Sequence, residues 1–169
     1  MLPLLVPAAL VAAPPPTVDK VDLARYMGDW FEIARLPNPF QRKCAITTAR
    51  YTLKEDLAFE VVNGCVTPEG KRLEAKGRAK VVDRATGSRI KVTFFWPFYG
   101  DYWILDLDPD YRWALVGTPD RKYLWVICRT ERMEPELLER VLDKAKRLGF
   151  DLGPLLWSPG ADRARAAAG

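Results

Sequence analysis

The chain has 169 residues, a length that suits one domain built around one core. Hydrophobic residues make up 49% and charged residues 28%, which excludes a collagen-like, disordered or multi-span membrane chain. The sequence contains no histidine, and this excludes the Ser-His-Asp triad, Cys-His pairs, histidine-ligated haem and most catalytic zinc sites. The net charge of +4 permits contact with anions without requiring nucleic acid.

The first segment, residues 1–18, is uncharged and largely apolar. Its apolar run is short and interrupted by prolines, so a signal-like leader fits better than a membrane-spanning helix. A proline-rich leader with no targeting role remains the alternative. The segment holds no cysteine that could carry a lipid anchor, which puts membrane attachment in doubt. We therefore expect a folded domain over 19–158 and a flexible tail over 159–169.

Short strand-like segments separated by turn signals fill the middle of the chain. In the clearest of them, Leu73 to Val81, small and apolar residues alternate with charged ones without a break. The pattern predicts eight strands, which cover 30–36, 44–53, 59–65, 73–81, 90–96, 102–107, 113–117 and 123–129. Eight antiparallel strands are enough to close a barrel that can hold one small ligand.

One helix follows the strands. Pro135 suits its first turn and Gly149 its end. Apolar residues at helical spacing, Leu138, Val141 and Ala145 among them, form one face, which we expect to pack on the outside of the barrel. The predicted fold is thus an all-β, eight-stranded antiparallel up-and-down barrel with one C-terminal helix.

Three motifs occur in order along these elements. Gly28-Asp29-Trp30 resembles the Gly-x-Trp signature of lipocalins, Asp108-Pro109-Asp110-Tyr111 resembles their Thr-Asp-Tyr motif, and Arg129 stands where their third motif lies. The second motif departs from the family pattern, because it has an extra proline and lacks the threonine. The resemblance covers roughly residues 21–157 and is greatest to the bacterial outer-membrane lipocalins and their vertebrate relative apolipoprotein D. It implies a barrel of the lipocalin/calycin type.

The three motifs are predicted to meet at one closed end of the barrel. Hairpins of an up-and-down barrel alternate between its ends, so Gly28, Trp30, Asp110 or Tyr111, and Arg129 converge there. A guanidinium over the indole of Trp30 would contribute on the order of 1 kcal/mol. We expect Arg129 to be structural, with ligand binding by this residue as the less favoured reading.

The same alternation assigns the loops near 36–43, 67–70, 96–101 and 118–122 to the open end. Cations concentrate there, and we expect them to attract a carboxylate or phosphate head group. The predicted head-group rim consists of Arg42, Lys43, Lys71, Arg72, Arg121 and Lys122. An ordinary solvated rim is the alternative.

The strand from Leu73 to Val81 predicts an internal cup, because its central inward positions carry side chains too small to fill a barrel. Those positions are Ala75, Gly77 and Ala79. Aromatic residues are expected to supply the other walls, with ordinary core packing as the alternative for each. The predicted ligand contacts are Tyr51, Phe59, Ala75, Gly77, Ala79, Phe94, Tyr102, Trp113 and Trp125.

The segment from Phe94 to Gly100 is unusually aromatic for a hairpin. Two readings are open. The aromatic rings either cap the core, or they form a ligand gate or a lip that touches a membrane.

Three cysteines allow one disulfide and one free thiol. Cys44 opens one strand and Cys65 closes the next, so they face each other across a hairpin and are predicted to form a disulfide near the open end. Cys128 shares the outward parity of Leu124 and Val126 and is predicted to be a buried free thiol. No cysteine spacing suggests a metal site, and no cofactor is expected.

These features predict a carrier without enzymatic activity. The expected ligand is a small hydrophobic molecule, a fatty acid or a lysophospholipid, held in an exported compartment that is periplasmic, secreted or outer-membrane associated. The resemblance implies a part in membrane lipid maintenance. An isomerase or de-epoxidase on the same barrel, with Asp106 as an inward general acid, is the alternative. Peripheral membrane contact and a homodimer stay open, and no nucleic-acid partner is expected.

Overall fold

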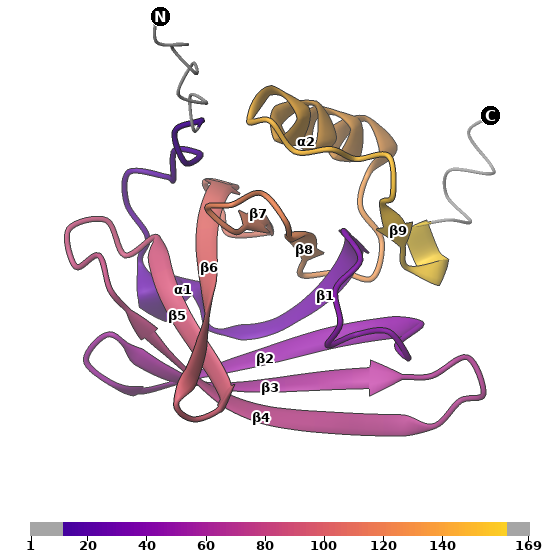
Figure 1. Ribbon diagram of the computed structural model, residues 1–169, viewed down its shortest axis with the longest axis horizontal. Coiled ribbons are helices and arrows are strands. Elements are labelled where there is room, and N and C mark those ends of the chain that lie inside the picture. Colours follow the sequence, from indigo (N-terminus) through magenta and orange to yellow (C-terminus); the bar gives the residue numbers. More distant parts are fainter. Residues whose placement is uncertain (1–11, 162–169) are drawn as a thin grey trace, which may run out of the picture.

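A computed structural model describes residues 12–161 of the protein and shows eight antiparallel strands wrapped into a barrel (Figure 1). The strands are β1 (Gly28–Arg35), β2 (Ile46–Glu55), β3 (Ala58–Val66), β4 (Arg72–Val81), β5 (Arg89–Phe95), β6 (Phe98–Leu107), β7 (Trp113–Gly117) and β8 (Leu124–Cys128). Each strand pairs with the next along the chain, and β1 also pairs with β8. The sheet therefore has no open edge between β1 and β8, and the predicted up-and-down barrel is confirmed.

The helix α2 (Pro135–Arg147) lies outside the barrel, above β7 and β8 in Figure 1. Leu138, Val141 and Ala145 are its buried residues, as the helical spacing predicts. They pack with outward-facing residues of β7 and β8, such as Leu115 and Val126. Among residues 12–161, no helix has the length and hydrophobicity needed to cross a bilayer.

Two further elements were not predicted. The short helix α1 (Leu23–Tyr26) is capped by Asp22, whose side chain accepts a hydrogen bond from the Arg25 amide. The short strand β9 (Leu156–Trp157) pairs with the end of β1. Elements of four and two residues are too short to show a hydrophobic period, and this is why the sequence pattern misses them.

The turn between β5 and β6 is shorter than predicted. The sequence suggests a turn over 97–100 and a strand from Tyr102, but β6 already begins at Phe98. Phe95 pairs with Phe98, and the Thr93 hydroxyl donates a hydrogen bond to the Phe98 carbonyl at 2.6 Å. These contacts extend the hairpin almost to its tip.

The end of the predicted leader lies against the barrel. The Val18 amide donates to the Ile104 carbonyl at 3.0 Å, and the Val21 amide donates to the Thr86 carbonyl at 2.7 Å. Both valines pack on the inner core. Residues 1–11 of the leader and 162–169 of the predicted tail lie outside the described residues.

Candidate functional site

One end of the barrel is closed by Arg129 and Trp30. The guanidinium carbon of Arg129 lies 3.7 Å from the centroid of a Trp30 ring. The same guanidinium donates hydrogen bonds to the carbonyls of Asp29, Arg25 and Tyr111, at 2.9 to 3.1 Å. One side chain thus ties together β1, α1 and the β6–β7 turn.

Three tyrosines lie above this plug. The Tyr102 hydroxyl is 2.7 Å from that of Tyr26 and 3.0 Å from that of Tyr51. Burial raises the pKa of all three well above the usual tyrosine value, so the hydroxyls stay neutral at physiological pH. Tyr51 and Tyr102, both predicted to contact ligand, therefore belong to the packed base of the barrel.

The lower half of the lumen is filled with side chains. Ile90 and Ile104 are fully buried, and Phe59, Val61 and Ala79 are nearly so. Ala79 was expected to border an empty space, but it packs within this inner core instead.

The upper half of the lumen is open. Along β4 and β5 the inward positions nearest the open end are solvent-accessible, with Leu73 at 38% and Phe94 at 41% exposure. Ala75, on the same inward row, is exposed too. β4 pairs with β5 only from Arg78 to Val81, so Leu73 and Ala75 lie on a part of β4 that has no β5 neighbour. Their exposure marks the end at which the barrel opens to the outside.

Small and polar side chains line one wall of the cup. Ala49 on β2 is in register with Asn63 on β3, and Asn63 is in register with Ala75 on β4. Ala49 and Asn63 were not predicted as lining residues. They could have been found by counting the register of the β2–β3 hairpin from its turn.

Gly77 has a different role from the one predicted. A Cβ atom at this position would lie 2.8 Å from Cδ1 of Phe94 and 2.6 Å from the Thr93 carbonyl oxygen. The glycine therefore accommodates the Phe94 ring against the sheet and does not simply leave space empty. Phe94, half exposed, forms the wall of the cup at this point.

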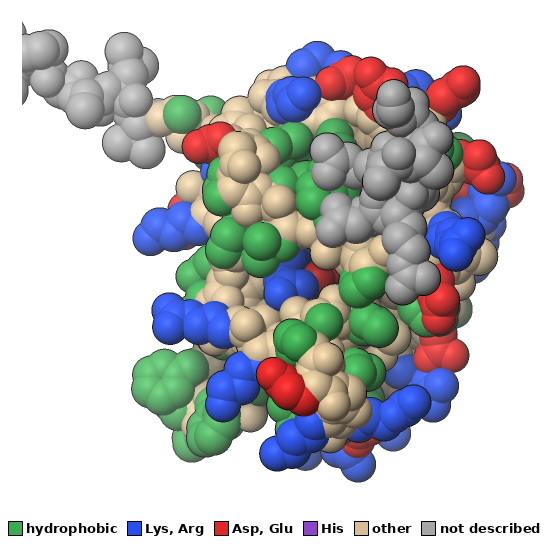
Figure 2. Space-filling view, turned by 90° about the vertical axis from the view of Figure 1, so that its right-hand side faces the viewer, with side chains coloured by type: hydrophobic (Ala, Val, Ile, Leu, Met, Phe, Trp, Pro, Cys, Tyr) green, Lys and Arg blue, Asp and Glu red, His purple; other side chains and the backbone are tan. Residues whose placement is uncertain are grey.

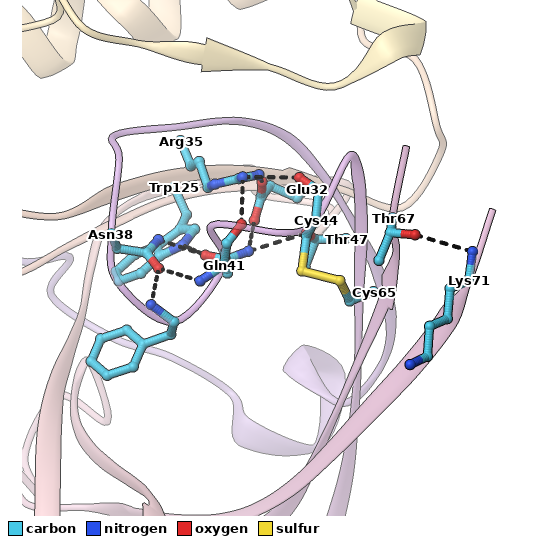
Figure 3. The surroundings of a disulfide bond; sticks show 11 residues. Glu32, Arg35, Asn38, Gln41, Cys44, Thr47, Cys65, Thr67, Lys71 and Trp125 are labelled. Carbon is cyan, nitrogen blue, oxygen red and sulfur yellow. Dashed lines mark hydrogen bonds and ion pairs between the residues drawn. A yellow bond between two sulfur atoms is a disulfide. The ribbon is translucent and has the colours of Figure 1, made fainter. Parts of the chain in front are cut away.

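A buried polar cluster occupies the opposite wall (Figure 3). Arg35 Nη1 donates to Glu32 Oε1 at 2.6 Å, and Gln41 Nε2 donates to Glu32 Oε2 at 2.6 Å. Gln41 also donates to the Thr47 hydroxyl, and its Oε1 accepts from the Trp125 indole at 2.9 Å. The cluster connects three strands with the 36–45 loop.

Charge within this cluster is balanced. Burial raises the pKa of Glu32, while the charge of Arg35 and hydrogen bonds from Arg35 and Gln41 oppose that rise. Arg35 Nη2 donates to the carbonyls of Gln41 and Cys44, and its buried Nε has no acceptor among the described residues. Sequence reasoning missed this pair, although Glu32 and Arg35 are the charged residues of an otherwise largely apolar segment.

The predicted ligand contacts separate into three groups. Ala75, Gly77, Phe94 and Trp125 lie toward the open end of the lumen. Tyr51, Phe59, Ala79 and Tyr102 lie in the packed lower part. Trp113 is not in the lumen, because its side chain faces outward and packs on the core beneath α2.

Five of the six predicted rim cations are exposed: Arg42, Lys43, Lys71, Arg72 and Lys122. Arg121 differs from them. Its Nε donates to the Leu148 carbonyl at 2.6 Å and its Nη2 to the Ala13 carbonyl at 2.8 Å. Arg121 thus supplies a hydrogen-bond donor to a carbonyl group at the C-terminal end of α2 and is not free to contact a ligand.

The disulfide prediction is confirmed. Cys44 and Cys65 are bonded, with their Cα atoms 5.3 Å apart. The bond joins the 36–45 loop to the end of β3, beside the polar cluster (Figure 3). Cys128 is a buried free thiol, as its parity with Leu124 predicts.

Asp106, the general acid in the alternative enzymatic function, does not act in the lumen. Its Oδ2 lies 3.3 Å from Lys144 Nζ, on the helix outside the barrel. The residue also borders an open hollow of about 880 Å³ beside α2, where acidic and basic side chains alternate. Within residues 12–161, no group of three His, Cys, Asp or Glu side chains could hold a metal ion.

Comparison with known proteins agrees with this architecture. The family model for the lipocalin-like domain matches residues 21–160. Outer membrane lipoprotein Blc of Escherichia coli is 40% identical over 141 residues, which are 83% of this chain and 80% of that protein. Temperature-induced lipocalin-1 of Arabidopsis thaliana is 39% identical over 154 residues, covering 86% and 82%. Among solved structures, insecticyanin of the tobacco hornworm superposes with a TM-score of 0.71 at 21% identity, covering 94% of this chain and 90% of that one.

Proposed function

Because the chain belongs to the lipocalin family, we propose that its cup binds a single-chain lipid with an anionic head, a fatty acid or a lysophospholipid. The observation that carries the proposal is the exposure of Ala75, Leu73 and Phe94 on the inward face of the sheet at the open end of the barrel. Because the lower lumen is filled, the ligand would be held in the upper half of the barrel.

Binding would come mainly from burial of the acyl chain. Each methylene group removed from water contributes about 0.8 kcal/mol, so ten to sixteen carbons support roughly micromolar affinity after the costs of association. The Glu32–Arg35 pair is compatible with this, because each charge is balanced by the other and leaves no unpaired charge beside the chain. The head group would remain among the exposed rim cations.

The proposed setting is the periplasm or the surface of the outer membrane, with a role in membrane lipid maintenance. The bacterial relatives are named outer membrane lipoproteins, and the Cys44–Cys65 disulfide suits an oxidising compartment. The relatives are named lipoproteins, so we do not infer from the lack of a cysteine in residues 1–18 that the protein is unattached to a membrane.

Filling the cup tests the proposal. Ala75→Trp places a large side chain in the upper lumen, where we expect it to weaken binding of a fluorescent fatty acid about tenfold or more, by displacing acyl-chain burial. Glu74→Trp, the neighbouring outward position, is the matched control and should bind like the parent chain. Native mass spectrometry of protein purified without detergent provides a second readout. Equal affinities for both variants, together with no co-purified lipid, would contradict the proposal.

A further inference from the structure

The tip of the β5–β6 hairpin presents aromatic side chains directly to solvent. Phe95 is 81% exposed, Trp96 80% and Phe98 77%. Phe40, in the 36–45 loop, is 80% exposed. Side chains this exposed do not cap the core, so the first reading of this aromatic segment is wrong. Neighbouring exposed aromatic side chains, such as those of the hairpin tip, mark a site of interaction with a protein or a membrane.

The hairpin lies at the open end of the barrel. β1 begins at the closed end, where Arg129 contacts Trp30, and the hairpins alternate from there. The turns after β1, β3, β5 and β7 are therefore at the mouth, and Phe40 shares that end with the hairpin. Figure 2 shows one side of the molecule, with a central hollow and hydrophobic side chains projecting at the margin beside blue cations. A surface that meets this lip would also meet the mouth.

The surroundings of the hairpin are positively charged. Lys76 and Arg78 lie on β4, beside β5, and both are exposed. Neither forms an ion pair within the described chain. The nearby acid Asp101 is already paired with Lys91 at 2.6 Å. Lys76 and Arg78 therefore add unpaired positive charge beside β5.

The hairpin is also held in place. Phe95 and Phe98 are paired across the turn, the Thr93 hydroxyl donates to the Phe98 carbonyl, and Lys80 Nζ lies 4.9 Å from the centroid of the Tyr99 ring. Binding through a preorganised tip costs little conformational entropy.

We propose that the β5–β6 hairpin is a docking lip for an anionic phospholipid bilayer, with Phe95, Trp96 and Phe98 entering the interface and the cations contacting lipid head groups. Aromatic side chains favour the level of the head groups, and basic residues are attracted to an anionic surface. The inference deepens the proposed function and rests on it for its purpose, because a docked lip would turn the mouth toward the source of its ligand.

Vesicle flotation tests the lip. We expect the protein to bind vesicles made of equal parts phosphatidylcholine and phosphatidylglycerol, and to bind pure phosphatidylcholine more weakly. Trp96→Ser with Phe98→Ser should reduce binding about tenfold or more, since both side chains would leave the interface. The matched control is Leu53→Ser with Val82→Ser, two exposed apolar residues at the closed end, which should bind like the parent chain.

Further variants separate the contribution of the cations to vesicle binding from the insertion of the aromatic tip. Lys76→Glu with Arg78→Glu should weaken binding to the anionic vesicles more than Lys20→Glu with Arg84→Glu, which changes the net charge equally at the closed end. Trp96→Phe should still bind, but the blue shift of tryptophan fluorescence on adding vesicles should shrink, because Trp96 is the reporter at the tip.

The outcomes separate this inference from the proposed function. Fatty-acid binding measured without vesicles should be unchanged in the Trp96→Ser, Phe98→Ser variant. If the parent chain binds fatty acid but never floats with vesicles, the lip is overturned and the carrier survives. A dimer in sedimentation velocity that dissociates on the same double substitution, without vesicle binding, would assign the surface to a second copy and overturn the lip as well.

Discussion

The Arg129 side chain holds three segments of the closed end together. Its planar fork of donors reaches three backbone carbonyls from three segments while its face covers the Trp30 ring. A lysine carries the same charge but lacks the planar fork. The conformation of this end therefore depends on the shape of the guanidinium as well as on its charge.

We predict that Arg129→Leu lowers the free energy of unfolding by about 2 to 4 kcal/mol, because three carbonyls lose their donor and the stacking on Trp30 is lost. Arg129→Lys should give an intermediate value. The measurement is urea unfolding at neutral pH, and Arg132→Leu, an exposed neighbour, is the control. A loss as small as that of the control would show that backbone packing closes this end without Arg129.

Asp108 gives the fold a dependence on pH. It is buried, and hydrogen bonds from the Arg112 side chain hold the pKa of its carboxyl below the ordinary value. Because the folded-state pKa is the lower one, Asp108 stabilises the fold above the unfolded pKa of about 4, and this contribution is lost as the pH falls through the folded-state pKa.

We therefore expect Asp108→Asn to lower stability at pH 7 by roughly 1 to 3 kcal/mol and to flatten the loss of stability below about pH 4. Urea unfolding at neutral and acidic pH would measure both effects. Asp110→Asn, at an exposed position of the same turn, should retain the acid sensitivity of the parent chain. Parallel pH curves for the Asp108 variant and the parent would contradict the assignment.

At the scale of elements, the 36–45 loop is fixed from two sides. The Cys44–Cys65 bond joins it to the end of β3, and Gln41 ties it to Glu32, Thr47 and Trp125 inside the barrel. The loop carries Phe40 and part of the cationic rim. The disulfide thus stabilises the edge of the cup as well as the hairpin.

Replacing the disulfide should be costly. The bond closes a separation of 21 residues, and the chain-entropy model gives a stabilisation of about 3 kcal/mol for a loop of this size. We expect Cys44→Ser with Cys65→Ser to lose stability on that order in thermal unfolding, and Cys128→Ala to lose less. Thiol counting on the unreduced, denatured parent should find one free cysteine. A count of three would exclude the bond in the isolated protein.

At the scale of the whole molecule, the barrel divides into a packed half and an open half. Aromatic residues and isoleucines fill the closed half, while small residues and a neutralised ion pair border the open half. Most of the inner-core packing therefore lies in the closed half. We expect substitutions of exposed side chains at the mouth to affect affinity more than folding, whereas the Cys44–Cys65 bond at the same end also stabilises the fold.

We expect the exposed cations at the mouth to attract an anionic ligand jointly. Neutralising Arg42, Lys71 and Arg72 to glutamine should weaken fatty-acid binding at low ionic strength, and the difference should shrink as salt is added. The control is Arg84→Gln with Lys20→Gln at the closed end, which should leave affinity unchanged. Affinity that stays the same at low salt after the rim substitutions would show that the rim is an ordinary solvated surface.

The sequence by itself determined the eight barrel strands, their order, the outer helix, the disulfide and the family, because alternation, turn residues and short motifs are local properties. The outward position of Cys128 also followed from parity along one strand. What required tertiary structure was the depth of the cup. Whether Ala79 borders space or packing depends on which side chains from distant strands meet it, and Trp113 faces outward beneath α2. The Glu32–Arg35–Gln41 cluster likewise exists only because a bulge in β1 and a folded loop bring these groups together.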